Sequence, residues 1–568
     1  MKKTVLVSVI FLLTTLSEKQ AQTQTVGNFI NSSQAFEGYN LIAPQSSFNT
    51  YLIDNCGRVV NEWESDYRIG LSAYILDDGS LLRTAQLGSD ATPSFSGGGT
   101  GGKIEMFNWE GDLTWSFVWA DSLQHQHHDI EMMPNGNILI LAWENHSYEE
   151  ALSLGKTPNT EGNSVWCCQV TEIMPYGENG GEIIWQWSAW DHLVQNTDSL
   201  LPNFSASISD APRKFNINYT TQGQNALNED WMHCNAIDYN SSLDQILISS
   251  AKFNEIFIIP HHLSTQETAT TAGDLLWRYG NPQTYGRGTI EDRKLFFQHD
   301  CQWIDDTEGG SGLSSRILVF NNGRNRPEGN LSSVDEIETP NLQNGTYPLE
   351  DITSPFLPET YSWRYPEAAE LDELFYAQRI SGASRLPNGN TLICNGPDGF
   401  GFEVTPEEEI VWEYINPVTA FGATTQGSDA GNNAVFRIPR YSMDFTGFIG
   451  RDMTPGDVIE LDSWIDNCTS DISVVEITKI EAYPNPFRDI VRVRFEDKGD
   501  WFIQTLEGKL IENGSSEKGD ILELGSDLNE GCYILRFENG YNMGKFLGFR
   551  KANFLQSIIY FKLPIPIK

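Results

Sequence analysis

The stretch HHDIEMMPNGNILILAW, from His127 to Trp143, contains two short alternating runs joined by a Pro-Asn-Gly-Asn turn. Alternation of apolar and polar residues indicates half-buried strands, and the Asn135-Gly136 pair readily adopts the positive φ angles of a two-residue hairpin turn. The stretch therefore predicts an antiparallel hairpin, with two adjacent histidines at the start of its first strand.

The same strand, turn and strand pattern recurs in LSAYILDDGSLLRTA, HCNAIDYNSSLDQILISSA, HDCQWIDD…SRILVFNNG and SGASRLPNGNTLICNG. Six tryptophans accompany the repeats, five of them after a Gly or acidic turn and a short strand-type run: Trp63, Trp115, Trp185, Trp277, Trp363 and Trp412. Six small antiparallel sheets favour an all-β, six-bladed β-propeller, because radial packing buries both faces of each sheet and hides most edges. We interpret the tryptophans as packing between blades.

The ends and the charge of the chain predict its compartment. Residues 1–21 combine two lysines, an apolar run and a small residue at Ala21, which is typical of a secretory signal peptide. No other segment approaches eighteen uninterrupted apolar residues, so we expect no membrane span. The formal net charge of −40 opposes nucleic acid and anionic membrane surfaces as partners.

Eight cysteines are scattered through the chain without a C-x-x-C pair, which gives no support to a zinc ribbon. Export permits disulfides, but the spacing selects no pairing. We expect the adjacent Cys167 and Cys168 to be unpaired strand residues facing opposite ways, in preference to a vicinal disulfide.

Alignment of the repeats on their turns places Leu71, His128 and Ser381 at one position. His233 and His299, which each head a strand, fall at the same position by pattern. The innermost strands of a propeller start at one end of its central channel, so residues distant in sequence meet there. We therefore predict a shared site containing His128, His233 and His299, with His127 on the other side of its strand.

Arginines near two strand ends complete this prediction. VFNNGRNRPEG contains Arg324 and Arg326, and NAVFRIPRYSMDF contains Arg437 and Arg440 in the presumed sixth blade. A guanidinium offers a fork of donors that suits sulfate or phosphate oxygens. We select Arg326 first, and Arg440 from the second pair, as candidate substrate-binding residues.

These segments resemble a known family. DWMHCNAIDYN, FFQHDCQWID, VFNNGRNR and LPNGNTLICNG…FEVTPEEEIVWEY are similar to the bacterial aryl-sulfate sulfotransferases, which are six-bladed propellers of exported compartments. The resemblance covers roughly residues 37–451. It implies transfer of a sulfuryl group from an aryl sulfate to a phenolic acceptor through a sulfohistidine, without a metal or nucleotide cofactor. By motif, His233, His299 and Arg326 correspond to family residues that bind or polarise the sulfuryl group.

One departure from the family concerns its nucleophilic histidine. The corresponding strand reads NTLICNGPDGFGFEV, residues 390–404, and contains no histidine; the nearest equivalent lies around Gly401. Three alternatives follow: another channel histidine, first of all His128, accepts the sulfuryl group; transfer is direct; or this branch of the family binds ligands without that catalysis.

The C-terminal part has a different character. IEAYPNPFRDIVRVRF and GCYILRFENGYNMGKFLGFRK resemble the type A sorting domain of the type IX secretion system of Bacteroidetes, a small β-sandwich. The resemblance implies the type IX machinery as a partner, and a protein that is secreted or at the cell surface. We predict a signal peptide (1–21), a propeller (37–451), a closing segment and linker (452–479), a sorting domain (480–551) and an extension (552–568).

Three functional hypotheses remain open at this point. The first is a cofactor-independent aryl-sulfate sulfotransferase that uses His128, His233 and His299. The second is a non-catalytic secreted propeller that binds sulfated or aromatic ligands. The third is a three-histidine zinc or copper site, although the spacing of the histidines is not a metal motif and we predict no metal.

Overall fold

The computed structural model describes residues 23–88, 95–99, 101–158, 163–220, 229–304, 315–367 and 376–463, and the strands of the C-terminal part with a few flanking residues between 481 and 551. The predicted signal peptide (1–21) and the extension (552–568) lie outside the described residues. Contacts divide the chain into two compact units, one of which is residues 25–468.

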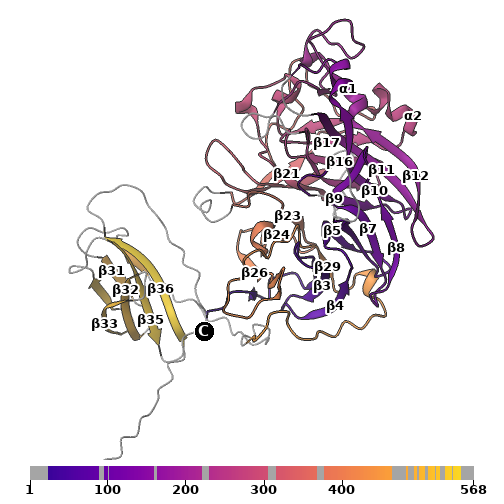
Figure 1. Cartoon of the computed structure of the whole chain (residues 1–568). Coiled ribbons are helices and arrows are strands. Elements are labelled where there is room, and N and C mark those ends of the chain that lie inside the picture. Colours follow the sequence, from indigo (N-terminus) through magenta and orange to yellow (C-terminus); the bar gives the residue numbers. More distant parts are fainter. Residues whose placement is uncertain are drawn as a thin grey trace, which may run out of the picture. The chain divides into compact units, whose positions relative to one another are not determined.

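The first of these units is a six-bladed β-propeller (Figure 1). Every blade is an antiparallel sheet whose innermost strand faces the central channel. The first three blades contain the following strands: β29 (Arg440–Ser442), β2 (Gly38–Ile42), β3 (Asn49–Asp54) and β4 (Val59–Glu64); β5 (Ile69–Ile75), β6 (Leu81–Gln86), β7 (Gly102–Phe107) and β8 (Leu113–Val118); β9 (Gln124–Met132), β10 (Ile138–Ser147), β11 (Ser164–Tyr176) and β12 (Gly180–Ser188).

The other three blades follow the same order from the channel outward. Their strands are β15 (Cys234–Asn240), β16 (Gln245–Ser250), β17 (Glu255–Pro260) and β18 (Trp277–Tyr279); β19 (His299–Ile304), β20 (Arg316–Asn321), β21 (Ser333–Glu338) and β22 (Trp363–Tyr365); β23 (Gly382–Arg385), β24 (Thr391–Asn395), β25 (Phe400–Val404), β26 (Ile410–Ile415) and β1 (Gly27–Asn31). The connections contain short elements. Within blades these are α1 (Tyr148–Ser153), between β10 and β11, and α2 (Thr265–Thr268), between β17 and β18; between blades, β13 (Leu193–Val194) pairs with β14 (Phe215–Asn216) and β27 (Val418–Thr419) with β28 (Gly422–Ala423).

Two exchanged strands close the ring. The late strand β29 pairs with β2 in the first blade, and the early strand β1 pairs with β26 in the last. Arg440 therefore begins the innermost strand of the first blade and does not belong to the sixth, because the chain crosses back to its beginning before forming β29. Arg437 lies in the segment that leads into this strand and is in no blade itself. Strand β1 also lies before residue 37, so the described propeller begins earlier than the repeat pattern indicated.

The repeated tryptophans join neighbouring blades, as predicted. Five indole Nε1–H groups donate hydrogen bonds to a carbonyl of the next blade: Trp63 to Asn108 (2.8 Å), Trp115 to Gly180 (2.8 Å), Trp185 to Leu263 (2.9 Å), Trp277 to Leu357 (2.7 Å) and Trp412 to Asn55 (2.7 Å). The sixth, Trp363, is half-buried and makes a cation–π contact in place of the hydrogen bond. The guanidinium of Arg385, from the next blade, lies 4.4 Å from the centroid of its ring. Each blade contact thus combines buried aromatic area with one directed polar interaction.

The C-terminal part is described by itself. It has one sheet of β30 (Glu481–Tyr483), β31 (Val491–Arg494) and β34 (Ile521–Leu524), and a second of β33 (Leu510–Ser516), β32 (Gly499–Thr505), β35 (Gly531–Asn539) and β36 (Asn542–Lys551). All their pairings are antiparallel. Among the described residues, no helix has the length and apolar character needed to cross a membrane.

One histidine links the third and fourth blades through two carboxylates. The imidazole of His261 lies with Nδ1 2.6 Å from Asp244 Oδ1 and Nε2 2.9 Å from Glu172 Oε2. Burial alone would lower the pKa of His261, but hydrogen bonds and charge from Glu172 and Asp244 raise it above 6.5. The charged imidazole therefore stabilises the folded chain below the ordinary histidine pKa.

We expect this stabilisation to be complete below about pH 6.5 and to disappear as the pH rises through the raised folded-state pKa. In His261→Gln, the fall in Tm between pH 6 and pH 8.5, measured by thermal denaturation, should be smaller than in the unchanged protein. His262→Gln, at the exposed neighbouring position, is the control and should keep the original fall. An unchanged pH profile in His261→Gln would contradict the assignment.

Candidate active site

An unusual backbone conformation begins the inner strands. Left-handed φ angles occur at Leu71 (130°), His128 (55°), His233 (49°), Asp300 (49°) and Ser381 (85°). The pairing register of the corresponding strands shifts near these positions in the second to fifth blades. A bulge of this kind re-aims a side chain, and such strain is found where the surrounding structure maintains it.

The three predicted histidines meet at these strand starts. The ring centroids of His128 and His233 are 4.8 Å apart and their planes are nearly perpendicular, at 86°. The ring of His299 lies 6.4 Å from that of His128. His128 is on β9, His299 begins β19, and His233 directly precedes β15, so three neighbouring blades contribute one imidazole each.

His233 is oriented by a carboxylate. Its Nδ1 lies 2.5 Å from Asp230 Oδ2, while Trp143 Nε1–H donates to Asp230 Oδ1 at 3.0 Å. Burial by itself would raise the pKa of the Asp230 carboxyl, but His233 and Lys252 lower it below its ordinary value. Asp230 is therefore ionised and fixes the orientation of the His233 ring through Nδ1, whereas Nε2 makes no hydrogen bond among the described residues.

His299 occupies both of its ring nitrogens. Nδ1 lies 2.8 Å from Asn322 Oδ1, and Nε2 accepts the backbone N–H of Ile380 at 3.2 Å. Burial lowers the pKa of His299 to about 3, so the ring is neutral at physiological pH. Because both nitrogens are engaged, His299 is better suited to a structural role in the site than to that of a nucleophile.

His128 rests on its neighbour in sequence. Its Nδ1 lies 2.8 Å from Nδ1 of His127, whose ring stacks on Trp143 with centroids 4.1 Å apart. Burial, followed by the nearby His233, lowers the pKa of His128 well below 6.5. If His127 donates the shared proton, His128 carries its own proton on Nε2 and is a hydrogen-bond donor toward the cluster.

A buried cation lies beside the cluster. The guanidinium of Arg437 donates to Asp129 Oδ2 (2.8 Å) and Tyr74 Oη (2.8 Å) and lies 3.2 Å from Asp300 Oδ1. Burial would lower the pKa of Arg437, but Asp129 and Asp300 raise it above its ordinary value. Arg437 thus connects Asp129 and Asp300, the residues that directly follow His128 and His299. The His-Asp pair that occurs twice in the sequence is the signal that could have identified this network.

The two selected arginines have other contacts. Arg440 is buried over Trp412, where it pairs with Glu403 and donates to Asn40 Oδ1 at 2.7 Å. Arg326 donates to Ser333 Oγ at 2.9 Å. Arg440 therefore holds the blade seam, because its charge is already matched by Glu403, and it is not part of the cluster.

Arg324 is linked to the histidines through Phe297. Its guanidinium lies 4.8 Å from the Phe297 ring centroid, and that ring contacts His233 at 6.0 Å and His299 at 5.8 Å between centroids. Among the arginines proposed from the sequence motif, Arg324 therefore has the closer connection to the site.

A glycine segment covers the histidines. The carbonyl of Gly99 accepts the backbone N–H of His128 at 2.8 Å, and a Cβ on Gly99 would lie 2.1 Å from His128 Cε1. A Cβ on Gly98 would lie 3.5 Å from His233 Cε1. The 3.5 Å distance at Gly98 is an ordinary contact, whereas at Gly99 only a residue without a side chain permits the close approach.

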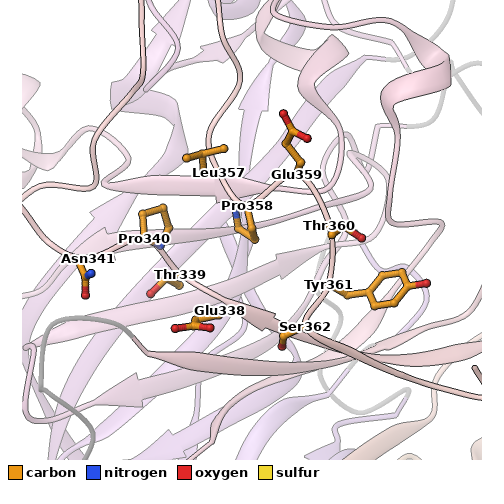
Figure 2. Close-up of a pocket in the computed structure, with 10 residues that line it drawn as sticks. All are labelled: Glu338, Thr339, Pro340, Asn341, Leu357, Pro358, Glu359, Thr360, Tyr361 and Ser362. Carbon is orange, nitrogen blue, oxygen red and sulfur yellow. The ribbon is translucent and has the colours of Figure 1, made fainter.

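A pocket on the fifth blade is separate from this chemistry. It measures about 410 Å³ and lies at the end of β21 and the segment before β22 (Figure 2). Its lining has two carboxylates, Glu338 and Glu359, with the phenol of Tyr361, and contains neither a histidine nor an arginine. It has no group that would attract an anionic sulfate ester.

The fold and the site together define an exported β-propeller with a histidine cluster at its channel. Residues 15–339 match the arylsulfotransferase (ASST) family, and residues 481–546 match the secretion system C-terminal sorting domain. The first match covers more than half of the chain, which therefore belongs to the arylsulfotransferase family. Its function is sulfotransferase-like, and the type IX sorting domain makes it a secreted or cell-surface protein that engages the type IX secretion machinery.

Other comparisons are more distant. No curated protein matches the chain. Similar solved structures include a protein of unknown function from Bacteroides caccae, with 13% identity over 72% of this chain and 99% of that chain and a TM-score of 0.36. A virginiamycin B lyase from Staphylococcus aureus has 11% identity over 70% and 90% with a TM-score of 0.31, and a periplasmic gluconolactonase from Pseudomonas aeruginosa has 9% identity over 86% and 99% with a TM-score of 0.32.

The close contact between Gly99 and His128 should make a side chain at position 99 more destabilising than one at a glycine with free space. Gly99 and Gly136 both have φ +85°, but nothing lies within 4 Å of a Cβ on Gly136. Gly136→Ala should cost only the backbone term of about 1–2 kcal/mol. Gly99→Ala should lower the Tm further, because its methyl group collides with the imidazole. Equal Tm values for the two variants, by thermal denaturation, would show that the segment moves away freely.

Proposed function

We propose that this protein transfers a sulfuryl group from an aryl sulfate to a phenolic acceptor and that His233 carries the group between them. The observation that supports this most is the Asp230–His233 pair, in which the carboxylate orients His233 beside His128 and His299. The proposal assigns the nucleophile to His233, whereas the sequence alone favoured His128.

In the first step, His233 Nε2 attacks the sulfur of the donor. The Nε2–S bond forms, the bond from sulfur to the aryl oxygen breaks, and the phenolate leaves with the electron pair. The ring keeps its Nδ1 proton and becomes positively charged, and the Asp230 carboxylate compensates that charge at 2.5 Å. No metal or nucleotide is needed, since a phenolate is already a stable leaving group.

In the second step, the acceptor phenol attacks the sulfur and the Nε2–S bond breaks. The phenolic proton passes to the first phenolate through solvent, and His233 returns to its neutral form. The net reaction exchanges one aryl sulfate for another. We assign the Nε2–H of His128 and the guanidinium of Arg324 to the sulfuryl oxygens, where charge develops in both steps.

A second candidate is a non-catalytic propeller that binds sulfated or aromatic ligands. The strand expected to carry the family's nucleophile favours it: Gly401 is in β25, where a Cβ would lie 2.7 Å from Ile438 Cδ1, so that position faces the blade core and could not present a histidine to the channel.

The first test measures transfer from 4-nitrophenyl sulfate to phenol by release of 4-nitrophenolate. His233→Ala should abolish transfer, and Asp230→Asn should lower kcat by about 10²–10⁴-fold, because the amide no longer fixes the tautomer or compensates the charge. His261→Gln, whose imidazole is held by Glu172 and Asp244, serves as the control and should keep full activity. Tight binding of the donor without turnover in the unchanged protein would favour the second candidate.

The second test locates the intermediate. After exposure to the donor alone, rapid acid-free digestion and mass spectrometry should find a sulfuryl adduct on the peptide that contains His233, and none in His233→Ala. An adduct on His128 would move the nucleophile to the third blade. Transfer without any adduct would indicate the direct reaction.

A further inference from the structure

A second cluster of ligating side chains lies on the third blade, away from the histidine site. Glu144 and His146 are two residues apart on β10, so their side chains share one face of the strand. Cys167 on β11 is the direct cross-strand partner of Glu144. One ligating atom of each of these three side chains lies within 4.8 Å of the other two.

Two of the three ligand separations match those around a tetrahedral ion. Glu144 Oε2 is 3.3 Å from His146 Nε2 and 3.6 Å from Cys167 Sγ. Zinc bonds of about 2.0–2.1 Å to oxygen and nitrogen and about 2.3 Å to sulfur require ligand separations of about 3.4 Å and about 3.6 Å respectively in a tetrahedron. Moreover, His146 Nε2 is buried and has no well-directed hydrogen bond among the described residues. Its lone pair passes beside the carboxylate oxygen, as it would if both atoms pointed at one ion.

Neighbouring groups hold the ligands in place. The ring of Trp190 stacks on His146 with centroids 3.8 Å apart and an interplanar angle of 4°, and Ser188 Oγ donates to Glu144. Such outer contacts orient metal ligands. The side chains of Glu144 and His146 are 23% and 15% exposed, which leaves a route from solvent.

Cys167 has no disulfide partner. It is a free, buried thiol, as are Cys168, Cys234, Cys301 and Cys394, whereas Cys56 is disulfide-bonded. A free thiol can serve as a zinc ligand, because its thiolate binds the ion. Cys168, the next residue, faces the opposite side of the strand and cannot join the site.

We propose that Glu144, His146 and Cys167 bind one zinc ion, with water in the fourth position, and that the ion fastens β10 to β11. Binding transfers the Cys167 thiol proton to solvent as the sulfur–zinc bond forms. This inference does not depend on the sulfuryl-transfer reaction.

The test titrates the full chain, stripped with EDTA, with Zn²⁺ by calorimetry and with Co²⁺ by absorption. We expect one equivalent of Zn²⁺ per chain and a near-ultraviolet thiolate-to-cobalt band. Cys167→Ser should abolish the band, and both Cys167→Ser and His146→Gln should weaken Zn²⁺ binding by more than the roughly 10–100-fold caused by loss of an outer partner. His146 is partly exposed, so His146→Gln serves if the buried cysteine variant does not fold.

Two controls make the result specific. Cys168→Ser changes the adjacent buried thiol on the opposite face, and His233→Ala removes the channel cluster; both should bind Zn²⁺ as the unchanged protein does. Absence of stoichiometric Zn²⁺, equal affinity in Cys167→Ser, or binding that is lost only in His233→Ala would overturn the proposal.

Discussion

The propeller depends on closure of its ring of blades, and buried indoles make the joints. A tryptophan on an outer strand packs against the next blade and donates its only N–H to a carbonyl there, which combines a large apolar surface with a satisfied polar group. At the fifth joint, Arg385 over Trp363 replaces the hydrogen bond. Strand β29 then pairs with β2 of the first blade and β1 with β26 of the last, so the two ends of the chain's propeller segment close the ring.

Closure also brings the site together. The inner strands of three neighbouring blades start near one another, and the left-handed backbone at His128, His233 and Asp300 turns these starts toward a common space. Such backbone is unfavourable for residues other than glycine, and the packed ring sustains it. Gly99 can lie against the His128 imidazole because it has no side chain to collide with the ring.

The charge of the chain opposes binding of the proposed donor, since the chain has a net charge of −40 and an aryl sulfate is an anion. Arg437, a buried cation beside the channel histidines, is matched by Asp129 and Asp300 and is not available to hold a sulfate. His128 and His299 are neutral because burial removes water from around the rings, and this desolvation opposes their charged form. Neutral donors, with Arg324 beyond Phe297, are therefore the groups to which the sulfuryl oxygens are assigned.

The sequence by itself determined the six repeats, the tryptophan joints and the C-terminal sorting domain, because strand alternation, turn chemistry and recurrence are local properties. It could not place Arg440 in the first blade, since only ring closure shows that the chain returns to β2. It also selected Arg440 for binding, whereas Glu403 already neutralises that charge. Asp230, three residues before His233, acquires its role from a bend in the chain, and Glu144, His146 and Cys167 become neighbours through the register between β10 and β11. Only the tertiary structure decided which polar groups meet, because pairing across strands and blades joins residues whose separation along the chain carries no signal.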